Sequence, residues 1–436
     1  MPHFLYLLGL AVFAQGTSEF MLAGLGPDIA RDLQVSLSDA GLLTSAFAVG
    51  MVVGAPSMAL LARRLSPRGA LLGFLTCFLA VHVIGALTGH FAVLLVTRIV
   101  GALANAGFLA VALATAVSMV RPDQKGRATS VLLGRVTLAC VAGVPAGAFL
   151  GQLWGWRSAF WAVAAVSLPA LVAIARSVPV GSAAVTDVAG APSGDGGAAR
   201  GADVAAARSG DGGASRGADQ AASPSTGTPV PLATELRTLR RPRLRLALLL
   251  GALVNGATFC AFTYLAPVIT DVAGLAEGWI PPLLALFGLG SFLGVTLAGR
   301  LADSRPRAVA GGGTVALVCA WTVFALTAGS GPAVIALVLL LGTLSFGVGA
   351  TVISRILYAA DGAPTLSGAY ATAALNMGAA LGPALGGLTL IWGPRGPLWT
   401  SAALTALALV AVPRAFKVAD VTSAGGAPYI QAPPAP

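Results

Sequence analysis

Charge is what this chain has least of. Only 10% of its 436 residues are Asp, Glu, Lys or Arg, against about 25% in a typical soluble protein. Hydrophobic residues make up 56%, and the mean hydropathy is +0.86. So few charges cannot cover the surface of a water-soluble globule. The composition therefore predicts a polytopic membrane protein.

The side chains that carry most enzymatic chemistry are also scarce. The three histidines are too few for a His-based metal site together with an acid–base pair. The four cysteines all lie within apolar runs with no close pair, so neither a metal knuckle nor a disulfide framework is expected. These absences argue against a membrane enzyme and predict no bound metal or cofactor.

Lysine is nearly absent, and this excludes one energy source. Lys125 and Lys417 are followed by Gly126 and Val418. A phosphate-binding loop needs Gly-Lys-Ser/Thr, so the chain has no Walker motif with which to hydrolyse ATP. The net charge of +10 does not indicate nucleic-acid binding, because the basic residues fall in loops between apolar runs.

Apolar runs are abundant, and a run of about 20 residues is enough to cross a bilayer. The chain contains twelve of them, each bounded by Arg, Pro, Gly or Asp. The predicted spans are 4–26, 39–61, 69–89, 92–117, 128–151, 158–177, 244–268, 279–300, 308–328, 333–357, 366–391 and 397–413. The basic residues cluster in alternate loops, for example Arg63 and Arg64 or Arg121 and Lys125, so both termini are predicted to be cytoplasmic.

A polar segment divides the twelve runs into six and six. Residues 178–243 are rich in Gly, Ala, Ser and Asp and contain a tandem duplication, SGDGGAARGADVAAA followed by SGDGGASRGADQAAS. Low hydrophobicity predicts a disordered cytoplasmic linker here. The expected domains are therefore 1–177, the linker 178–243, 244–413, and a cytoplasmic tail 414–436.

The two halves repeat each other at an offset of 240 residues without a gap. The matching positions are Phe47 and Phe287, Gly50 and Gly290, Gly54 and Gly294, Leu61 and Leu301, and Ala62 and Ala302. Parallel repeats related by an axis along the membrane normal are typical of major facilitator transporters. The predicted fold is an all-α polytopic membrane protein with 12 transmembrane helices in two pseudo-symmetric six-helix halves.

The sequence GRLADSRPR, from Gly299 to Arg307, resembles the loop motif Gly-x-Leu-Ala-Asp-Arg-x-Gly-Arg of the major facilitator superfamily. The resemblance implies a gating loop that uses Gly299, Asp303, Arg305 and Arg307. The first-half copy, ALLARRLSPR, has Arg63 where the motif has Asp. We therefore expect the second-half copy to contribute more to gating.

A second motif resembles the drug:proton antiporter branch of that superfamily. The run GAALGPALGG is similar to the signature Gly-x-x-x-Gly-Pro-x-x-Gly-Gly, and its matching residues are Gly378, Gly382, Pro383, Gly386 and Gly387. Ordinary close packing of membrane helices is the other interpretation. The segments GTSEFMLAGLGPDIARDL and AYATAALNMGAALGP look like actinomycete chloramphenicol-resistance efflux proteins, and the sugar-efflux-like branch shares much of this text.

Glu19 is the one acid inside an apolar run. Burying an acid there costs about 2.5–3.5 kcal/mol, which makes it a functional candidate. Arg98 is expected at a similar depth, since Glu19 lies about 22 Å from one face and Arg98 about 9 Å from the other in a core of about 30 Å. Glu19 could exchange protons for cargo beside Arg98, or the two could form a static buried ion pair.

Other polar and aromatic residues are weaker candidates for the substrate cavity. For each of them, packing between helices is an equally good interpretation, and for His82 packing is the favoured one. The candidates are Gln15, Asn105, Asn255, Phe259, Tyr264, Phe346 and Asn376.

The resemblance implies a proton-coupled efflux antiporter of the bacterial inner membrane. It would export chloramphenicol or similar amphipathic antibiotics by rocking two halves about a central site, as a monomer, with protons as its other partner. Export of a sugar or another metabolite is the alternative. A channel would be expected to show repeated pore-lining rings in a smaller unit, and a signalling module would need a folded cytoplasmic domain.

Overall fold

The structure is a computed structural model that describes residues 3–62, 65–118, 132, 135–177, 232–301, 306–361, 363 and 366–415. The described residues are helical apart from short turns and connections. Most of the predicted linker, from 178 to 231, and the tail from 416 onward lie outside this part of the chain.

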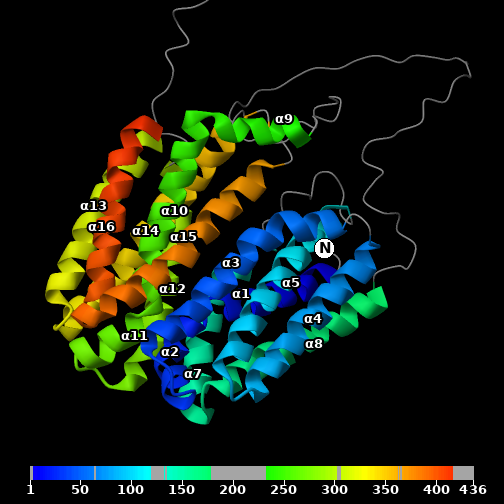
Figure 1. Cartoon of the computed structure of the whole chain (residues 1–436), viewed down its shortest axis with the longest axis horizontal. Coiled ribbons are helices and arrows are strands. Elements are labelled where there is room, and N and C mark those ends of the chain that lie inside the picture. Colours follow the sequence, from blue (N-terminus) through cyan, green and yellow to red (C-terminus); the bar gives the residue numbers. More distant parts are fainter. Residues whose placement is uncertain are drawn as a thin grey trace, which may run out of the picture.

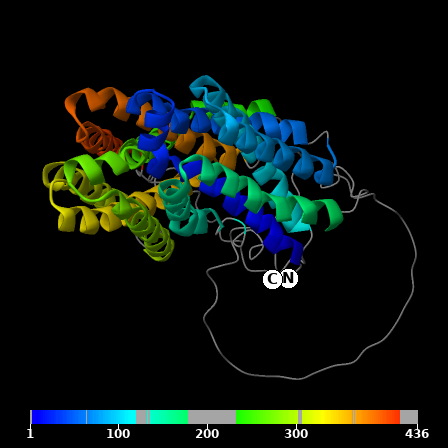
Figure 2. The ribbon, with the colours of Figure 1, turned by 90° about the horizontal axis from the view of Figure 1, so that it is seen from below.

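The helices fall into two groups that lie side by side in both views (Figures 1 and 2). The first group, the N-half, is drawn in blue to green-cyan. It contains α1 (His3–Phe20), α2 (Leu22–Asp32), α3 (Leu37–Ala62), α4 (Pro67–Leu87), α5 (Phe91–Ser118), the π-helix η2 (Ala139–Gly143), α7 (Val144–Trp154) and α8 (Arg157–Ser177).

The second group, the C-half, is drawn in green to red. It contains α10 (Pro242–Thr263), α11 (Leu265–Pro267), the π-helix η5 (Val268–Val272), the 3-10 helix η6 (Glu277–Trp279), α12 (Ile280–Leu301), α13 (Pro306–Thr327), α14 (Gly331–Ala359), α15 (Ser367–Thr389), the 3-10 helix η7 (Leu390–Trp392) and α16 (Gly396–Ala415). The repeat is visible in the packing, since α3 packs on α5 just as α12 packs on α14.

The predicted fold class is confirmed. In the described residues, eleven helices are long and apolar enough to cross a membrane, and a bent pair makes up to twelve. The bent pair is the first span. The sequence predicted one helix over 4–26, whereas α1 ends at Phe20 and α2 continues after Met21 at an angle of 54°. Glycine and proline cause most sharp helix bends, and Gly16, Gly24 and Pro27 surround this break.

The fifth span also departs from a regular helix. Within this span, the five residues Ala139–Gly143 form one π-turn immediately before α7. The first turn of α7 contains Pro145. Proline has no N–H and its ring clashes with the carbonyl four residues earlier, which in a regular helix would be that of Val141. A wider π-turn relieves this clash, and such turns are frequent at functional sites.

The two halves meet where α3 packs on α15, where α12 packs on η2 and α7, and where α2 packs on α11, α10 and α12. A Cβ atom on Gly288 of α12 would overlap the carbonyl of Cys140, so only glycine permits this backbone approach. Figure 1 shows α2, α7 and α11 together at one end of the bundle, which we call the α2 end. The start of α1 and the short helix α9 (Leu232–Arg237) lie at the opposite end, the α9 end.

Helix α9 and the 3-10 helix η4 (Thr238–Arg240) occupy the last part of the predicted linker. This part is helical, where the sequence interpretation had placed the end of a disordered segment. Glu235 of α9 is 2% exposed, and its carboxylate accepts a hydrogen bond from the Leu366 backbone N–H at 2.9 Å. The Tyr370 hydroxyl donates to the Glu235 carbonyl at 3.0 Å. These bonds tie α9 to the start of α15.

Candidate functional site

Glu19 lies in the last turn of α1, next to the break at Met21. Its side chain is half-buried. It interacts electrostatically with Arg98 of α5 and with Cys140 of η2. The structure therefore brings the predicted acid and the predicted cation into one site, with the π-turn as the third element beside them.

Arg98 is buried, with 2% of its surface exposed, and its hydrogen bonds go to Ser18 rather than to Glu19. One guanidinium nitrogen, Nη1, donates to the Ser18 hydroxyl at 2.9 Å, and Nη2 donates to the Ser18 carbonyl at 2.8 Å. The Phe47 ring lies 4.4 Å from the guanidinium carbon, a cation–π contact. These three contacts fix the position of the charge.

Glu19 and Arg98 do not form an ion pair in the described part of the chain. The pairs found there within 4.0 Å join Arg31 to Asp28 and to Glu277, and Arg157 to Asp32. The static ion pair that the sequence analysis left open is therefore absent from this conformation. A half-buried acid beside a cation that is bonded elsewhere can take up or release a proton without first breaking a salt bridge.

Gln15 lies one helical turn before Glu19 and is 1% exposed. Neither its amide nitrogen nor its amide oxygen has a hydrogen-bond partner. A buried amide without partners costs about 1–3 kcal/mol. Native structures keep few such groups, and each one calls for an explanation such as water, strain or a ligand.

The opposite wall of the site is aromatic. Phe20 of α1 lies 5.6 Å from Phe259, measured between ring centroids, and the rings continue into the C-half from there. The further centroid distances are 6.5 Å for Phe259–Phe262, 4.6 Å for Phe262–Phe287 and 6.1 Å for Phe287–Phe346. These five phenylalanines, the phenylalanine row, enclose a void of about 10 Å³ together with Cys140 and Thr258, room for about one water molecule.

Two predicted cavity aromatics, Phe259 and Phe346, belong to this row, and Tyr264 does not. Tyr264 is 1% exposed and donates a hydrogen bond from its hydroxyl to the Pro383 carbonyl at 2.8 Å. A Cβ atom on Gly41 of α3 would overlap that hydroxyl. Tyr264 thus lies in the contact between α10, α15 and α3 rather than in a cavity.

The three predicted amides also make contacts between or within helices. Asn105 donates to the Met51 sulfur at 3.6 Å, and Asn255 donates to the Leu375 carbonyl at 2.7 Å. Asn376 donates to the Thr372 carbonyl of its own helix at 3.0 Å. For these residues the packing interpretation describes what the structure contains.

The structure describes all of the antiporter motif (residues 378–387) and only part of the loop motif (residues 299–307). In the antiporter motif, Cβ atoms on Gly378 and Gly382 would overlap the backbone of α10, so these glycines permit the close crossing of α10 and α15. Gly386 makes room for the ring of Tyr264 and Gly387 for its hydroxyl, and the Pro383 carbonyl accepts the hydrogen bond from that hydroxyl. In the loop motif, Gly299 lies in α12 and Arg307 in α13. Asp303 and Arg305 lie outside the described residues.

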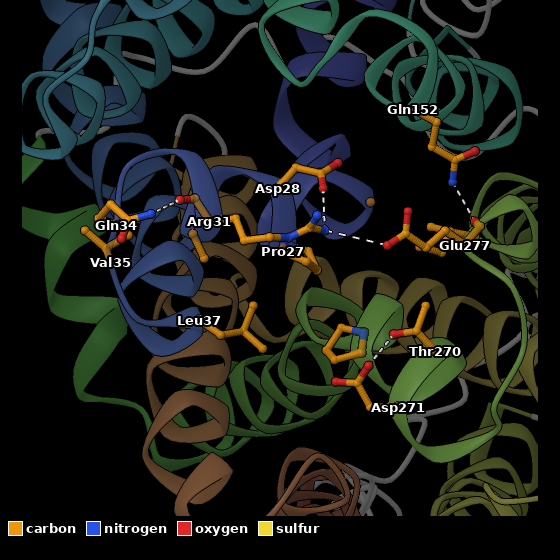
Figure 3. A pocket seen from close by; sticks show the side chains of 14 residues that line it. Pro27, Asp28, Arg31, Gln34, Val35, Leu37, Gln152, Thr270, Asp271 and Glu277 are labelled. Atoms are coloured by element: carbon orange, nitrogen blue, oxygen red, sulfur yellow. Dashed lines mark hydrogen bonds and ion pairs between the residues drawn. The ribbon is translucent and has the colours of Figure 1, made fainter.

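A cavity of about 620 Å³ lies between the halves at the α2 end, and its polar lining includes Asp28, Arg31, Gln152, Asp271 and Glu277. Figure 3 shows Arg31 between Asp28 of its own helix and Glu277 of the C-half. The N–O distances are 2.8 Å and 3.6 Å. Gln152 of α7 also donates to the Glu277 carbonyl, so two residues of the N-half hold η6, which directly precedes α12.

The far end of α2 is also tied to its own half. The Trp156 indole donates to the Asp32 carboxylate at 3.1 Å, and Arg157 pairs with the same carboxylate. In the described part of the chain, no group of three His, Cys, Asp or Glu side chains could hold a metal ion.

The Major Facilitator Superfamily matches residues 8–374 of this sequence. The chain belongs to this superfamily. Major facilitator proteins are transporters and not a class of enzymes, and the apolar helices make this chain a multi-pass membrane protein.

Relatives of this facilitator come from several bacteria. A chloramphenicol resistance protein of Streptomyces lividans is 50% identical over 427 residues, 97% of this chain and 98% of the relative. The inner membrane transport protein YdhP of Escherichia coli (strain K12) is 29% identical over 386 residues, 88% of each chain. The MFS-type transporter YtbD of Bacillus subtilis (strain 168) is 28% identical over 388 residues, 88% of this chain and 87% of that one.

Solved major facilitator structures share the fold. Two are of a bacterial homolog to the human lysosomal transporter Spinster, both inward-facing, one occupied and one unoccupied. The occupied form has a TM-score of 0.69 at 17% identity and covers 94% of this chain and 95% of that one. The unoccupied form has a TM-score of 0.63 at 19% identity and covers 95% of each. Together with the family match, these neighbours confirm the architecture predicted from the sequence.

Proposed function

We propose that this facilitator is a proton-coupled antiporter that exports chloramphenicol or similar amphipathic antibiotics across the bacterial inner membrane and so confers resistance. The observation that carries this proposal is the 50% identity, over nearly the whole chain, to a chloramphenicol resistance protein. Its partners would be a small lipophilic drug and protons, and it would act as a monomer with both termini in the cytoplasm.

The central site supports this proposal chemically. An aromatic, lipophilic drug needs apolar surface for most of its area and a few polar groups for orientation. The phenylalanine row offers the first, and the unpartnered amide of Gln15 offers the second. Glu19 would carry the proton, because it is half-buried beside this row and free of an ion pair in the described part of the chain.

Alternating access would expose this site to one side at a time. The contacts of Arg31, Gln152, Tyr264 and Gly288 close the α2 end in this conformation, which we assign to the outside. Opening that end requires these contacts to separate while the halves rock together at the α9 end. The loop from Gly299 to Arg307 would take part in closing the α9 end, as the resemblance implies.

The test is accumulation of radiolabelled chloramphenicol in cells that express the protein, with and without an uncoupler. We expect low accumulation that rises with the uncoupler, and high accumulation in Glu19→Gln with or without it. Glu19→Asp is the matched control, since it keeps a carboxylate at the same position and should retain part of the export. All three proteins must reach the membrane in equal amounts, measured by immunoblot.

Each alternative outcome has a definite meaning. Wild-type cells that accumulate as much drug as empty cells would contradict the chloramphenicol assignment and place export of a sugar or other metabolite first. Export by Glu19→Gln at the wild-type level would leave drug export standing and remove Glu19 from proton coupling.

A further inference from the structure

Ser18 is the centre of a buried hydrogen-bond chain that the efflux proposal does not use. Its exposed fraction is 0%, and that of His82 on α4 is 3%. The Ser18 hydroxyl lies 2.7 Å from Nε2 of His82 and 2.9 Å from Nη1 of Arg98. Nδ1 of His82 lies 2.7 Å from the Phe78 carbonyl. Three helices of the N-half, α1, α4 and α5, therefore meet at one serine oxygen.

The direction of each hydrogen bond in this chain follows from its partners. The Phe78 carbonyl can only accept, so Nδ1 of His82 carries the proton and donates it. A neutral imidazole with Nδ1 protonated has a free lone pair on Nε2, which accepts from the Ser18 hydroxyl. The Ser18 oxygen then accepts from Arg98, which can only donate. The order is Arg98 to Ser18 to His82 to Phe78.

The break in α1 supplies the second acceptor. The last four carbonyl groups of a helix lack partners within that helix, and Ser18 is among the last residues of α1. Its carbonyl takes the Nη2 donor of Arg98 at 2.8 Å. Both terminal nitrogens of the guanidinium are thus bonded to neutral oxygens of the residue directly before Glu19. The third nitrogen, Nε, has no partner and is buried.

We propose that Ser18 and His82 are positioning residues of the coupling site, which hold Arg98 beside Glu19 while preventing the two from forming an ion pair. Glu19 then gains and loses its proton next to a fixed positive charge, and no salt bridge has to break at each cycle. This inference rests on the proposed role of Glu19 as the proton carrier.

Arg98 is the charge that stands next to Glu19, and the other charged groups of the surrounding elements lie farther away. Cys140 is the titratable group that η2 presents to Glu19. Arg135 contacts α1 at Gly9, ten residues or about 15 Å along the helix. On the other helices that pack against α1, the charges among the described residues are Asp28, Arg31 and Asp32 in the second half of α2, Arg157 and Arg176 near the ends of α8, and Asp39 near the start of α3.

Removing the serine hydroxyl tests the proposal directly. In Ser18→Ala, Nη1 of Arg98 loses its acceptor, and a buried charged donor without an acceptor is costly. The carboxylate of Glu19 is then the nearest strong acceptor, and a closer cation favours the ionised acid. We expect the protonation midpoint of Glu19 to move to lower pH by about one unit. Ser18→Thr keeps a hydroxyl and should titrate as the wild type does.

His82→Phe is a second variant, which keeps a ring against Phe78 and Phe160 but removes the acceptor of the Ser18 proton. A smaller shift in the same direction is expected, because Ser18 can still accept from Arg98. Ser167→Ala is the matched control. Ser167 is also 0% exposed, but its hydroxyl bonds to the Val163 carbonyl of its own helix, α8.

The measurement is an infrared difference titration of the full-length protein in lipid nanodiscs, which follows the C=O stretch of the protonated carboxyl group. The band of Glu19 is the one that Glu19→Gln removes. The same proteins, reconstituted in liposomes, give the pH profile of chloramphenicol transport. A purely structural role for Ser18 would lower the yield or the maximal rate of the variant without moving either midpoint.

Each result decides the question. A shift in Ser18→Ala with unshifted Ser18→Thr and Ser167→Ala supports the proposal. Equal midpoints in Ser18→Ala and wild type, an equal shift in Ser167→Ala, or a Glu19 band that does not titrate would overturn it. A clear shift in a protein that does not transport chloramphenicol would overturn the efflux assignment and leave the positioning of Arg98 in place.

Discussion

The two halves repeat each other in backbone and differ in chemistry. At the offset of 240 residues, Glu19 of the N-half corresponds to Phe259 of the C-half, and Arg98 corresponds to Val338. Phe47 packs under the guanidinium in the N-half, whereas its counterpart Phe287 belongs to the phenylalanine row. The N-half contains a buried charge and a hydrogen-bond chain next to Glu19. The C-half presents aromatic rings.

This difference shows how a duplicated scaffold can divide two tasks. A proton carrier needs a polar surrounding that tolerates both of its charge states, whereas a lipophilic guest needs apolar area. If one half held both the proton carrier and the apolar surface, the polar groups would reduce the apolar area, and the apolar groups would disfavour the ionised carrier. A shared interface allows the two halves to act on one cavity, so the comparison predicts which variants affect coupling and which affect cargo.

The largest effect should come from making the N-half resemble the C-half. Arg98→Val introduces the residue found at the equivalent position, leaves Ser18 and His82 without their cation, and leaves Glu19 buried without a neighbouring positive charge. We expect proton-driven transport in liposomes to fall at least about tenfold for every substrate, since losing a buried partner costs several kcal/mol.

Two controls keep this result interpretable. Arg98→Lys retains the charge and should keep part of the activity, and Val338→Ala changes the equivalent position of the C-half. A thermal unfolding curve of each variant separates loss of folding from loss of coupling. Wild-type transport by a folded Arg98→Val protein would end the idea that the N-half carries the proton.

An intermediate effect is expected in the phenylalanine row. Phe262→Leu removes the ring stacked at 4.6 Å on Phe287, and aromatic pairs contribute about 0.5–1.5 kcal/mol beyond burial. The KM for chloramphenicol should therefore rise about twofold to tenfold, with the pH profile unchanged.

Phe108→Leu is the control for this variant. Phe108 of α5 is 0% exposed and lies in an apolar core cluster of the N-half with Leu71 and Phe74, apart from the phenylalanine row. The KM of this control variant for chloramphenicol should stay at the wild-type value. A pH profile that moved in Phe262→Leu would show that the C-half also sets proton coupling and would weaken the division between the halves.

The smallest effect is expected for Asn376, one of the amides that the sequence offers as a candidate for the cavity. Asn376 is 9% exposed and bonds to its own helix, so Asn376→Ala should change transport by less than about twofold, consistent with a local side-chain to backbone bond. Uptake assays at several drug concentrations would measure this. A tenfold rise in KM would instead place Asn376 against the drug.

Hydropathy was sufficient to predict the spans and their division into two halves, because every helix here must present apolar residues to lipid or to a neighbour. It could not predict the break at Met21 or the π-turn Ala139–Gly143, since both depend on how glycine and proline are accommodated against other helices. The sequence therefore predicted one continuous helix over 4–26, where the structure has two helices joined by a bend.

The site was predictable in part. Glu19 stood out because it is an acid in an apolar run, and its depth pointed to Arg98. Ser18 gave no such signal, since serines are common in membrane helices, and its role is visible only once α4 and α5 are in place. His82 did carry a signal, as a histidine within an apolar run, and was assigned to packing. The amides gave an ambiguous signal, because helices also use amides to bind each other, as Asn105 and Asn255 do here.

The bend between α1 and α2 allows α2 to move as a lever about the joint at Met21. The arm is α2, about 16 Å long for its 11 residues, and Arg31 near its tip reaches Glu277 of the other half. Straightening the 54° bend would carry that tip sideways by about 15 Å and release this link in one stroke. Exposed ion pairs contribute at most about 1 kcal/mol, so the Arg31–Glu277 pair opposes this movement only weakly. The stiffness of the joint between α1 and α2 would then determine how readily the α2 end opens.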